Sequence, residues 1–190
     1  MKFATVSIIV ILLAVGAFFG FKVGQHNTTS NLQTNLSQHA TANPQVLNLN
    51  NKGLTRVASD IYSKTNTTEL ILSNNSIKTL PSEMGRMNQL VIFKIDHNLL
   101  DGSLIGEIRQ MSQLKNLDVS FNKMTGMPAE IGQLSNLETL NYSYNNISGI
   151  PDELSHLKNN LKEINLTGNP LSQASIAKLK SSLPNTTVIF

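Results

Sequence analysis

One pattern of apolar and polar residues recurs six times between residues 44 and 171, at a spacing of 23 to 24 residues. Its clearest copies are LKNLDVSFNKM, which begins at Leu114, and LETLNYSYNNI, which begins at Leu137. A fixed period of this length is typical of solenoids, in which each repeat contacts only its neighbours along the chain. The repeat therefore constrains the architecture before any single residue is interpreted.

The pattern reads L-x-x-L-x-L-x-x-N-x-L, and its positions are numbered 1 to 11 below. Positions 4, 6 and 11 are apolar or aromatic in all six copies, whereas position 9 is asparagine in five of them and Lys52 in the first. An asparagine amide has both donors and an acceptor, so we expect it to satisfy backbone groups of its own turn and of adjoining turns. This expected structural ladder comprises Asn75, Asn98, Asn122, Asn145 and Asn169.

These motifs resemble the repeats of the leucine-rich repeat (LRR) family over residues 44 to 190. The segments LPSEMGRMNQL and MPAEIGQLSNL are similar to the LPxxIGxLxxL subtype, from which the third copy, DGSLIGEIRQMSQL, departs by lacking the proline. The closing stretch is similar to the cap of bacterial surface proteins of the family. The resemblance implies an α/β solenoid that is curved, with parallel β-strands on its concave face and turns or short helices on its convex face.

The first 43 residues differ from the repeats in composition. Residues 3–21 contain no charge and would reach about 28 Å as a helix, close to the thickness of a bilayer core. We predict an uncleaved signal-anchor helix within residues 1–24, and a cleaved signal peptide, giving a secreted protein, is the alternative. Residues 25–43 are polar and uncharged, which predicts a flexible linker. The amino terminus and Lys2 favour a cytoplasmic N-terminus, so the repeats would lie outside the cytoplasm, in the periplasm or at the cell surface.

The predicted domain plan continues with six repeats at residues 44–171 and a C-terminal cap at residues 172–190. In the cap, Ile176, Leu179 and Leu183 recur at helical spacing, and Ser172 can cap a helix. The final residues, from Thr187 onward, predict a last strand or an apolar lid. The start of the stack has no comparable cap, so we expect residues 40–63 to be its least regular part.

Composition excludes several classes of function. The chain has no cysteine, and its 15 basic and 12 acidic residues form no basic run that could follow a phosphate backbone. It also lacks a phosphate-binding loop, a G-x-S-x-G motif and a histidine pair at metal-ligand spacing. We therefore expect no catalytic site, metal, cofactor or nucleic-acid partner.

The positions that the pattern leaves free are the candidates for binding. The expected concave face is formed by positions 2, 3, 5, 7 and 8, and strands stacked about 5 Å apart would place equal positions side by side. Aromatic groups ringed by hydrogen-bonding residues are typical of the centre of a protein interface. Alternatively, position 8 is simply variable, without a binding role. The candidate ligand-binding residues are Lys94, Asp118 and Asn141 at position 5 and His97, Phe121 and Tyr144 at position 8.

Together these features predict a non-enzymatic, membrane-anchored LRR protein that binds a protein or peptide through its concave face. A structural or adhesive component of the cell envelope is the alternative, as is a secreted LRR protein after signal cleavage. Weak self-association could add to either, because Gly16, Gly20 and Gly24 fall four residues apart and would let two membrane helices approach closely.

Overall fold

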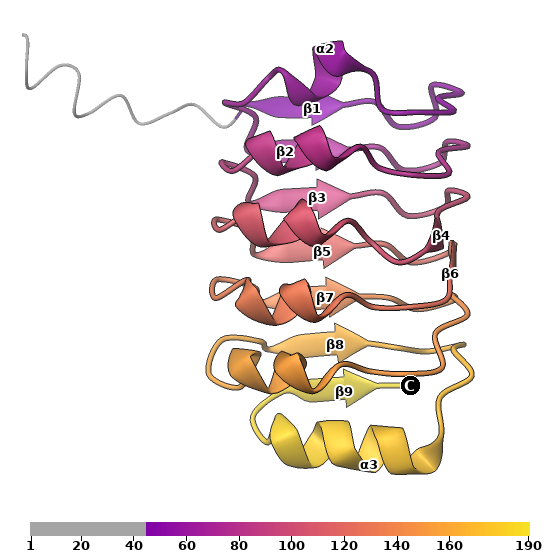
Figure 1. Ribbon diagram of the computed structural model, residues 1–190, viewed down its shortest axis with the longest axis vertical. Coiled ribbons are helices and arrows are strands. Elements are labelled where there is room, and N and C mark those ends of the chain that lie inside the picture. The colour runs from indigo at the N-terminus through magenta and orange to yellow at the C-terminus, as the bar shows by residue number, and fades with distance from the viewer. Residues whose placement is uncertain (1–44) are drawn as a thin grey trace, which may run out of the picture. The chain divides into compact units, whose positions relative to one another are not determined.

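The computed structural model describes residues 45–190, which form one stack of repeats (Figure 1). The expected anchor at residues 1–24 and linker at residues 25–43 lie outside the described residues. Within residues 45–190, none of the helices combines the length and the hydropathy that crossing a bilayer requires.

The main sheet has seven strands in the order β1-β2-β3-β5-β7-β8-β9, and every neighbouring pair is parallel. Each strand pairs in register with the same template position of the next copy, as Phe93 does with Leu117. The strands are β1 (Val46–Asn48), β2 (Glu69–Ile71), β3 (Ile92–Lys94), β5 (Asn116–Asp118), β7 (Thr139–Asn141), β8 (Glu163–Asn165) and β9 (Thr187–Ile189). Equal positions therefore form straight rows across the sheet, and the expected solenoid of parallel strands is confirmed.

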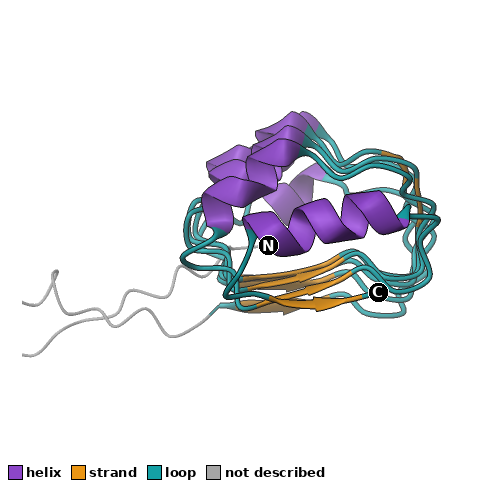
Figure 2. Ribbon diagram, turned by 90° about the horizontal axis from the view of Figure 1, so that it is seen from below, coloured by secondary structure: helices purple, strands orange, loops and turns teal. Residues whose placement is uncertain are grey.

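Short helices return the chain on the face opposite the strands (Figure 2). Three of them begin directly after a proline with extended backbone, namely Pro81, Pro128 and Pro151, and the fourth begins after Ile105 in the same conformation. They are the 3₁₀-helices η1 (Ser82–Arg86), η2 (Gly106–Gln110), η3 (Ala129–Gln133) and η4 (Asp152–Leu157). The expectation of short helical turns is confirmed, and the copy without proline keeps the same path.

The remaining elements lie at the margins of the stack. The first copy has a single turn of α-helix, α2 (Ser59–Tyr62), in place of a 3₁₀-helix. A small second sheet pairs β4 (Asp101–Gly102) with β6 (Lys123–Met124). At the C-terminal end, Ser172 caps α3 (Gln173–Ser182) by accepting a hydrogen bond from the Ser175 N–H, which confirms the predicted capping helix.

The core fills the space between strands and helices. Positions 4, 6 and 11 point into it, and in the second copy Leu70, Leu72 and Ile77 are all 0% exposed. One core residue carries a polar group, because Tyr142 occupies position 6 and its hydroxyl has no hydrogen-bond partner within the described residues. Burying that hydroxyl without a partner lowers the stability of the fold locally.

The asparagine at position 9 joins each copy to the copy before it. The Asn122 side-chain oxygen accepts the Leu100 N–H at 2.9 Å. Its amide nitrogen donates to the carbonyls of Ile95, Val119 and Ser120 at 3.0 to 3.1 Å. The amides of Asn75, Asn98, Asn145 and Asn169 likewise bond backbone groups of two successive copies. Lys52, at the start of the ladder, is exposed.

Replacing Asn122 with alanine should lower the free energy of unfolding by about 1 to 3 kcal/mol, because backbone groups of two copies lose their partner. Chemical denaturation of the two proteins measures this difference. Asn146→Ala is the matched control, since Asn146 is exposed and its side chain makes no hydrogen bond within residues 45–190. Equal stability of Asn122→Ala and Asn146→Ala would contradict the role of the ladder.

Replacing Tyr142 with phenylalanine should leave stability at pH 7 unchanged or raise it by about 1 kcal/mol, since it removes an unpaired buried hydroxyl. Burial also raises the pKa of Tyr142 well above its ordinary value of about 10. As the pH rises, Tyr142 therefore ionises in the unfolded chain before it ionises in the folded protein. Below pH 10 the free energy of unfolding is unaffected, and above pH 10 it falls. Urea unfolding at pH 7 and above pH 10 should show the advantage of Tyr142→Phe growing, and a constant difference would refute it.

Candidate binding surface

Positions 3, 5 and 7 of the strand copies are part of the face that the sequence predicts to be concave, and they are hereafter called the strand face. Lys94, Asp118 and Asn141 lie side by side in its middle, as adjacent partners of the sheet register. Together with residues of β5, β7 and β8 they line a hollow of about 240 Å³. The predicted position-5 residues are thus brought together in one place.

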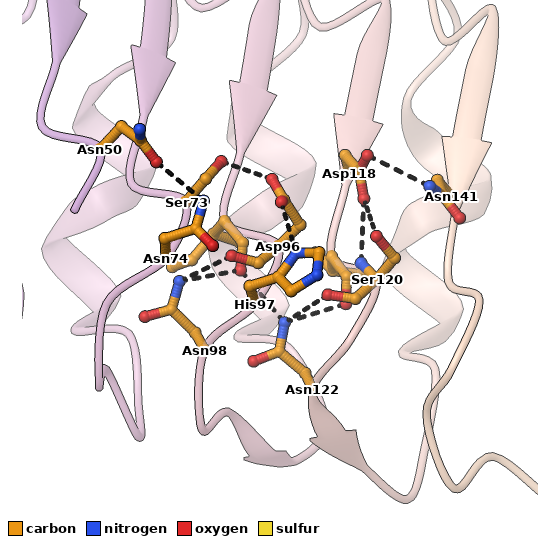
Figure 3. A network of polar contacts seen from close by, with 12 residues as sticks. Asn50, Ser73, Asn74, Asp96, His97, Asn98, Asp118, Ser120, Asn122 and Asn141 are labelled. Carbon is orange, nitrogen blue, oxygen red and sulfur yellow. Dashed lines mark hydrogen bonds and ion pairs between the residues drawn. The ribbon is translucent and has the colours of Figure 1, made fainter.

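Two of these three side chains are already engaged within the protein (Figure 3). One Asp118 oxygen accepts hydrogen bonds from the Ser120 N–H at 2.9 Å and hydroxyl at 2.6 Å, and the other accepts from the Asn141 amide at 3.1 Å. The Asn141 oxygen accepts in turn from the Ser143 N–H and hydroxyl. Asp118 and Asn141 are therefore fixed in orientation, whereas Lys94 is exposed and its side chain has no hydrogen bond or ion pair within the described residues.

His97, Phe121 and Tyr144 form a continuous stack, which we call the aromatic ladder. The ring centroids of His97 and Phe121 are 4.2 Å apart with an interplanar angle of 15°. Those of Phe121 and Tyr144 are 4.4 Å apart with an angle of 17°. Phe121 and Tyr144 are nevertheless 42% and 50% exposed, so the stack presents a broad apolar surface to solvent.

The aromatic ladder lies in the turn that follows each strand, and not on the strands themselves. Position 8 therefore borders the strand face at the carboxyl ends of the strands. The reason is the backbone, because φ is 52° at His97 and Phe121 and 54° at Tyr144, which turns the chain out of the sheet. The other copies have Asn51, Asn74 and Gly168 there, also with positive φ. The left-handed conformation costs an ordinary residue about 1 to 2 kcal/mol, whereas glycine and asparagine tolerate it.

The ring faces are covered and the ring edges are open. Each inner face lies on the next ring. Beyond the last ring, a Cβ atom at Gly168 would lie only 2.8 Å from Cδ1 of Tyr144, so only a glycine leaves room for this ring. At the other end, Nδ1 of His97 lies 2.9 Å from an Asp96 oxygen, and Asp96 also accepts the Ser73 hydroxyl (Figure 3). A ligand therefore meets ring edges, which carry partial positive charge and favour apolar or oxygen-bearing groups.

Sequence analysis missed the supporting residues Asp96, Ser73 and Gly168. The signal that could have revealed the turn is the pair Asn51 and Asn74 together with Gly168, all at position 8, because these residue types favour positive φ.

Other hollows of the described surface offer fewer groups that could bind a ligand. One of about 420 Å³ lies between η4 and α3, where the Lys178 amine is 2.6 Å from an Asp152 oxygen. No group of three potential metal ligands gathers anywhere in residues 45–190.

Comparison with known proteins identifies the repeat. Two family models described as leucine-rich repeats match the chain, one at residues 112–171 and the other at residues 66–87. No curated protein matches it.

Several solved structures resemble the chain. An LRR protein of Leptospira interrogans is 26% identical over 72% of this chain and 40% of its own, with a TM-score of 0.59. The LRR ectodomain of the receptor kinase SOBIR1 from Arabidopsis thaliana is 30% identical over 67% of this chain and 72% of its own, with a TM-score of 0.59. The Arabidopsis receptor kinase HAESA, in complex with the peptide hormone IDA and the co-receptor SERK1, is 28% identical over 80% of this chain, with a TM-score of 0.67. The chain spans only 26% of HAESA and 40% of the Leptospira protein.

The cost of the backbone at position 8 can be measured at Phe121. Phe121→Ala and Phe121→Asn both remove the ring, but asparagine tolerates positive φ better, so Phe121→Asn should be more stable by about 1 kcal/mol. Thermal or urea unfolding gives the difference. The same pair of substitutions at Lys123, a strand position of β6, is the control and should not favour asparagine. Equal stability of the two Phe121 variants would mean that the left-handed backbone imposes no such cost.

Proposed function

Because the chain belongs to the leucine-rich repeat family, we propose that it is a binding module, without enzymatic activity, that recognises a protein or peptide through the strand face and the aromatic ladder beside it. The observation that carries this proposal is the ladder itself. Three consecutive copies place aromatic rings at a position where the backbone disfavours them, and leave the two largest rings about half exposed. A ligand that covered these rings would recover the free energy of burying their apolar surface.

The surroundings of the ladder suit recognition. Aromatic side chains supply much of the binding energy of protein interfaces when polar groups surround them and exclude water. Here the polar groups of Asp118, Asn141 and Asp96 are already oriented by hydrogen bonds, so little side-chain entropy is lost when a partner binds. The ladder supplies the apolar centre and the strand face supplies a fixed polar rim.

The similar structures support a peptide or protein as the ligand class. HAESA was solved with a peptide hormone and a co-receptor bound, and this chain resembles part of that receptor. This chain spans only 26% of that receptor, so the ligand has to be derived from the residues present here.

Residues 3–21 are proposed to anchor the protein as a single-pass membrane helix, with residues 25–43 as the linker and the repeats outside the cytoplasm. Two observations support this arrangement. The segment is free of charge over 19 positions. The likeness to receptor ectodomains is consistent with repeats on the outer side of a membrane.

The proposal is tested by selecting phage-displayed random peptides on the detergent-solubilised full-length protein. Peptides recovered on the parent should bind Phe121→Ala/Tyr144→Ala about tenfold or more weakly, because the apolar centre of the surface is gone. Binding is measured by surface plasmon resonance, with circular dichroism to establish that the variant is folded.

Phe190→Ala is the matched control for loss of an exposed ring. Phe190 is 52% exposed and lies beside Lys180 at the end of the chain, away from the ladder. Selected peptides should bind it as they bind the parent. Peptides that bind the parent and the double variant equally would refute a role for the ladder.

A further inference from the structure

The strand face carries a charge opposite in sign to that of the whole chain. Positions 3, 5 and 7 of the described strands hold a single basic residue, Lys94, against four acidic ones. The face therefore has a net charge of −3 with histidine neutral, whereas the complete chain has a net charge of +3. The acidic residues are Glu69, Asp96, Asp118 and Glu163.

This negative charge is not neutralised by ion pairs with lysine or arginine inside the described part of the protein. Asp118 is held by Ser120 and Asn141, which are uncharged, and neither Glu69 nor Glu163 has an ion pair there. At position 2, directly beside the strand face, Lys162 and Lys115 flank Glu138 and lower the pKa of its carboxyl, so both lysines are already paired. The strand face is thus left for a cationic partner to neutralise.

Three of the acids recur at a regular interval along the stack. Glu69 lies on β2, Asp118 on β5 and Glu163 on β8, so that successive acids are two strands apart in the sheet order. At about 4.8 Å per strand, this interval is about 10 Å. Glu69 and Glu163 are at position 3 and Asp118 is at position 5, an offset of about 7 Å along the strand that long lysine or arginine side chains can span.

A polyproline II helix has the matching repeat. It rises about 3.1 Å per residue with three residues per turn, so every third side chain points the same way at intervals of about 9.3 Å. A peptide in β-strand conformation would instead send residues three apart to opposite faces. The acid spacing therefore matches a polyproline II ligand that lies along the stack, across the strands.

The aromatic ladder runs in the same direction, from the turn after β3 to the turn after β7. Its exposed rings lie at position 8, in the turn three residues after position 5, and therefore border the strand face on which the peptide would lie. Aromatic surfaces are the usual docking sites of polyproline II segments, because proline rings pack on them with little loss of conformational entropy.

We propose that the ligand is a basic, proline-rich peptide in polyproline II conformation, with a cationic side chain at every third residue facing Glu69, Asp118 and Glu163 and with prolines against the aromatic ladder. This inference rests on the proposed function, which requires only that some protein or peptide bind at the ladder.

Fluorescence anisotropy with labelled synthetic peptides tests the inference on the full-length protein in detergent. The probe is Lys-Pro-Ser repeated four times. It should bind more tightly than a peptide of the same composition with its four lysines contiguous, and Glu-Pro-Ser repeated four times should not bind. Added salt should weaken binding, because the ion pairs are exposed.

Variants of the protein show whether removing an acidic or a basic residue from the strand face weakens or tightens binding of the probe. Glu69→Gln/Glu163→Gln should weaken probe binding by between about twofold and thirtyfold, the range for two exposed ion pairs. Lys94→Gln should tighten it, because it removes the only cation of the strand face. The matched control, Glu83→Gln/Glu153→Gln, changes the net charge equally on η1 and η4, behind the sheet, and should change affinity less than about twofold.

The outcomes separate this inference from the proposed function. Equal binding of the regular and contiguous-lysine peptides, or no effect of Glu69→Gln/Glu163→Gln, overturns the inference. If ladder-dependent peptides are selected from the random library but carry no basic residues at intervals of three, the proposed function stands and the inference fails. If the probe binds as inferred but Phe121→Ala/Tyr144→Ala leaves its affinity unchanged, the role proposed for the ladder fails.

Discussion

Each repeat is tied to the one before it by a single asparagine amide. The amide oxygen accepts the position-11 N–H of the preceding copy, as Asn98 does from Ile77, and the amide nitrogen donates to position-6 carbonyls of both copies. Backbone hydrogen bonds between copies continue through the turn, as from the His97 N–H to Ser120 and from the Leu99 N–H to Ile77, and the amide bonds the groups that these leave without a backbone partner. One side chain per copy therefore satisfies the backbone N–H and carbonyl groups between neighbouring copies, which allows the stack to be long and regular.

The path of the chain into this asparagine also constrains the backbone conformation at position 8. The chain bends between the strand and the asparagine, and in every described copy the residue at position 8 makes that bend with positive φ. Asparagine and glycine adopt positive φ at little cost, so the turn itself does not explain why three copies have an aromatic residue there. The stacking of His97, Phe121 and Tyr144 offsets part of the cost, since aromatic pairs contribute about 0.5 to 1.5 kcal/mol each.

The solenoid was predictable from the sequence because its causes are local and periodic. The apolar positions 4, 6 and 11 and the asparagine at position 9 recur in each copy, and Ser172 before a helical pattern predicts α3. That the three rings lie side by side was predictable from the period, but the turn that carries them was not, because in three copies a bulky residue replaces the asparagine or glycine that indicates positive φ. The engagement of Asp118 and Asn141 depends on hydroxyls two residues later, in DVS and NYS, a pattern that also occurs by chance.

Many polar side chains of the strand face are already hydrogen-bonded to groups of the same face. This leaves fewer donors and acceptors with which a ligand could be recognised. In the copies with Asn or Asp at position 5, such as Asn141 and Asn165, that side chain accepts the N–H of position 7. Where position 5 is Ile71 or Lys94, the position-7 residues Ser73 and Asp96 bond each other instead. What remains for a ligand is chiefly the net charge of the carboxylates and the apolar edges of the rings. Selectivity on such a surface follows from the spacing of charges along the stack, because that spacing is fixed by the strands and cannot adapt to a mismatched partner.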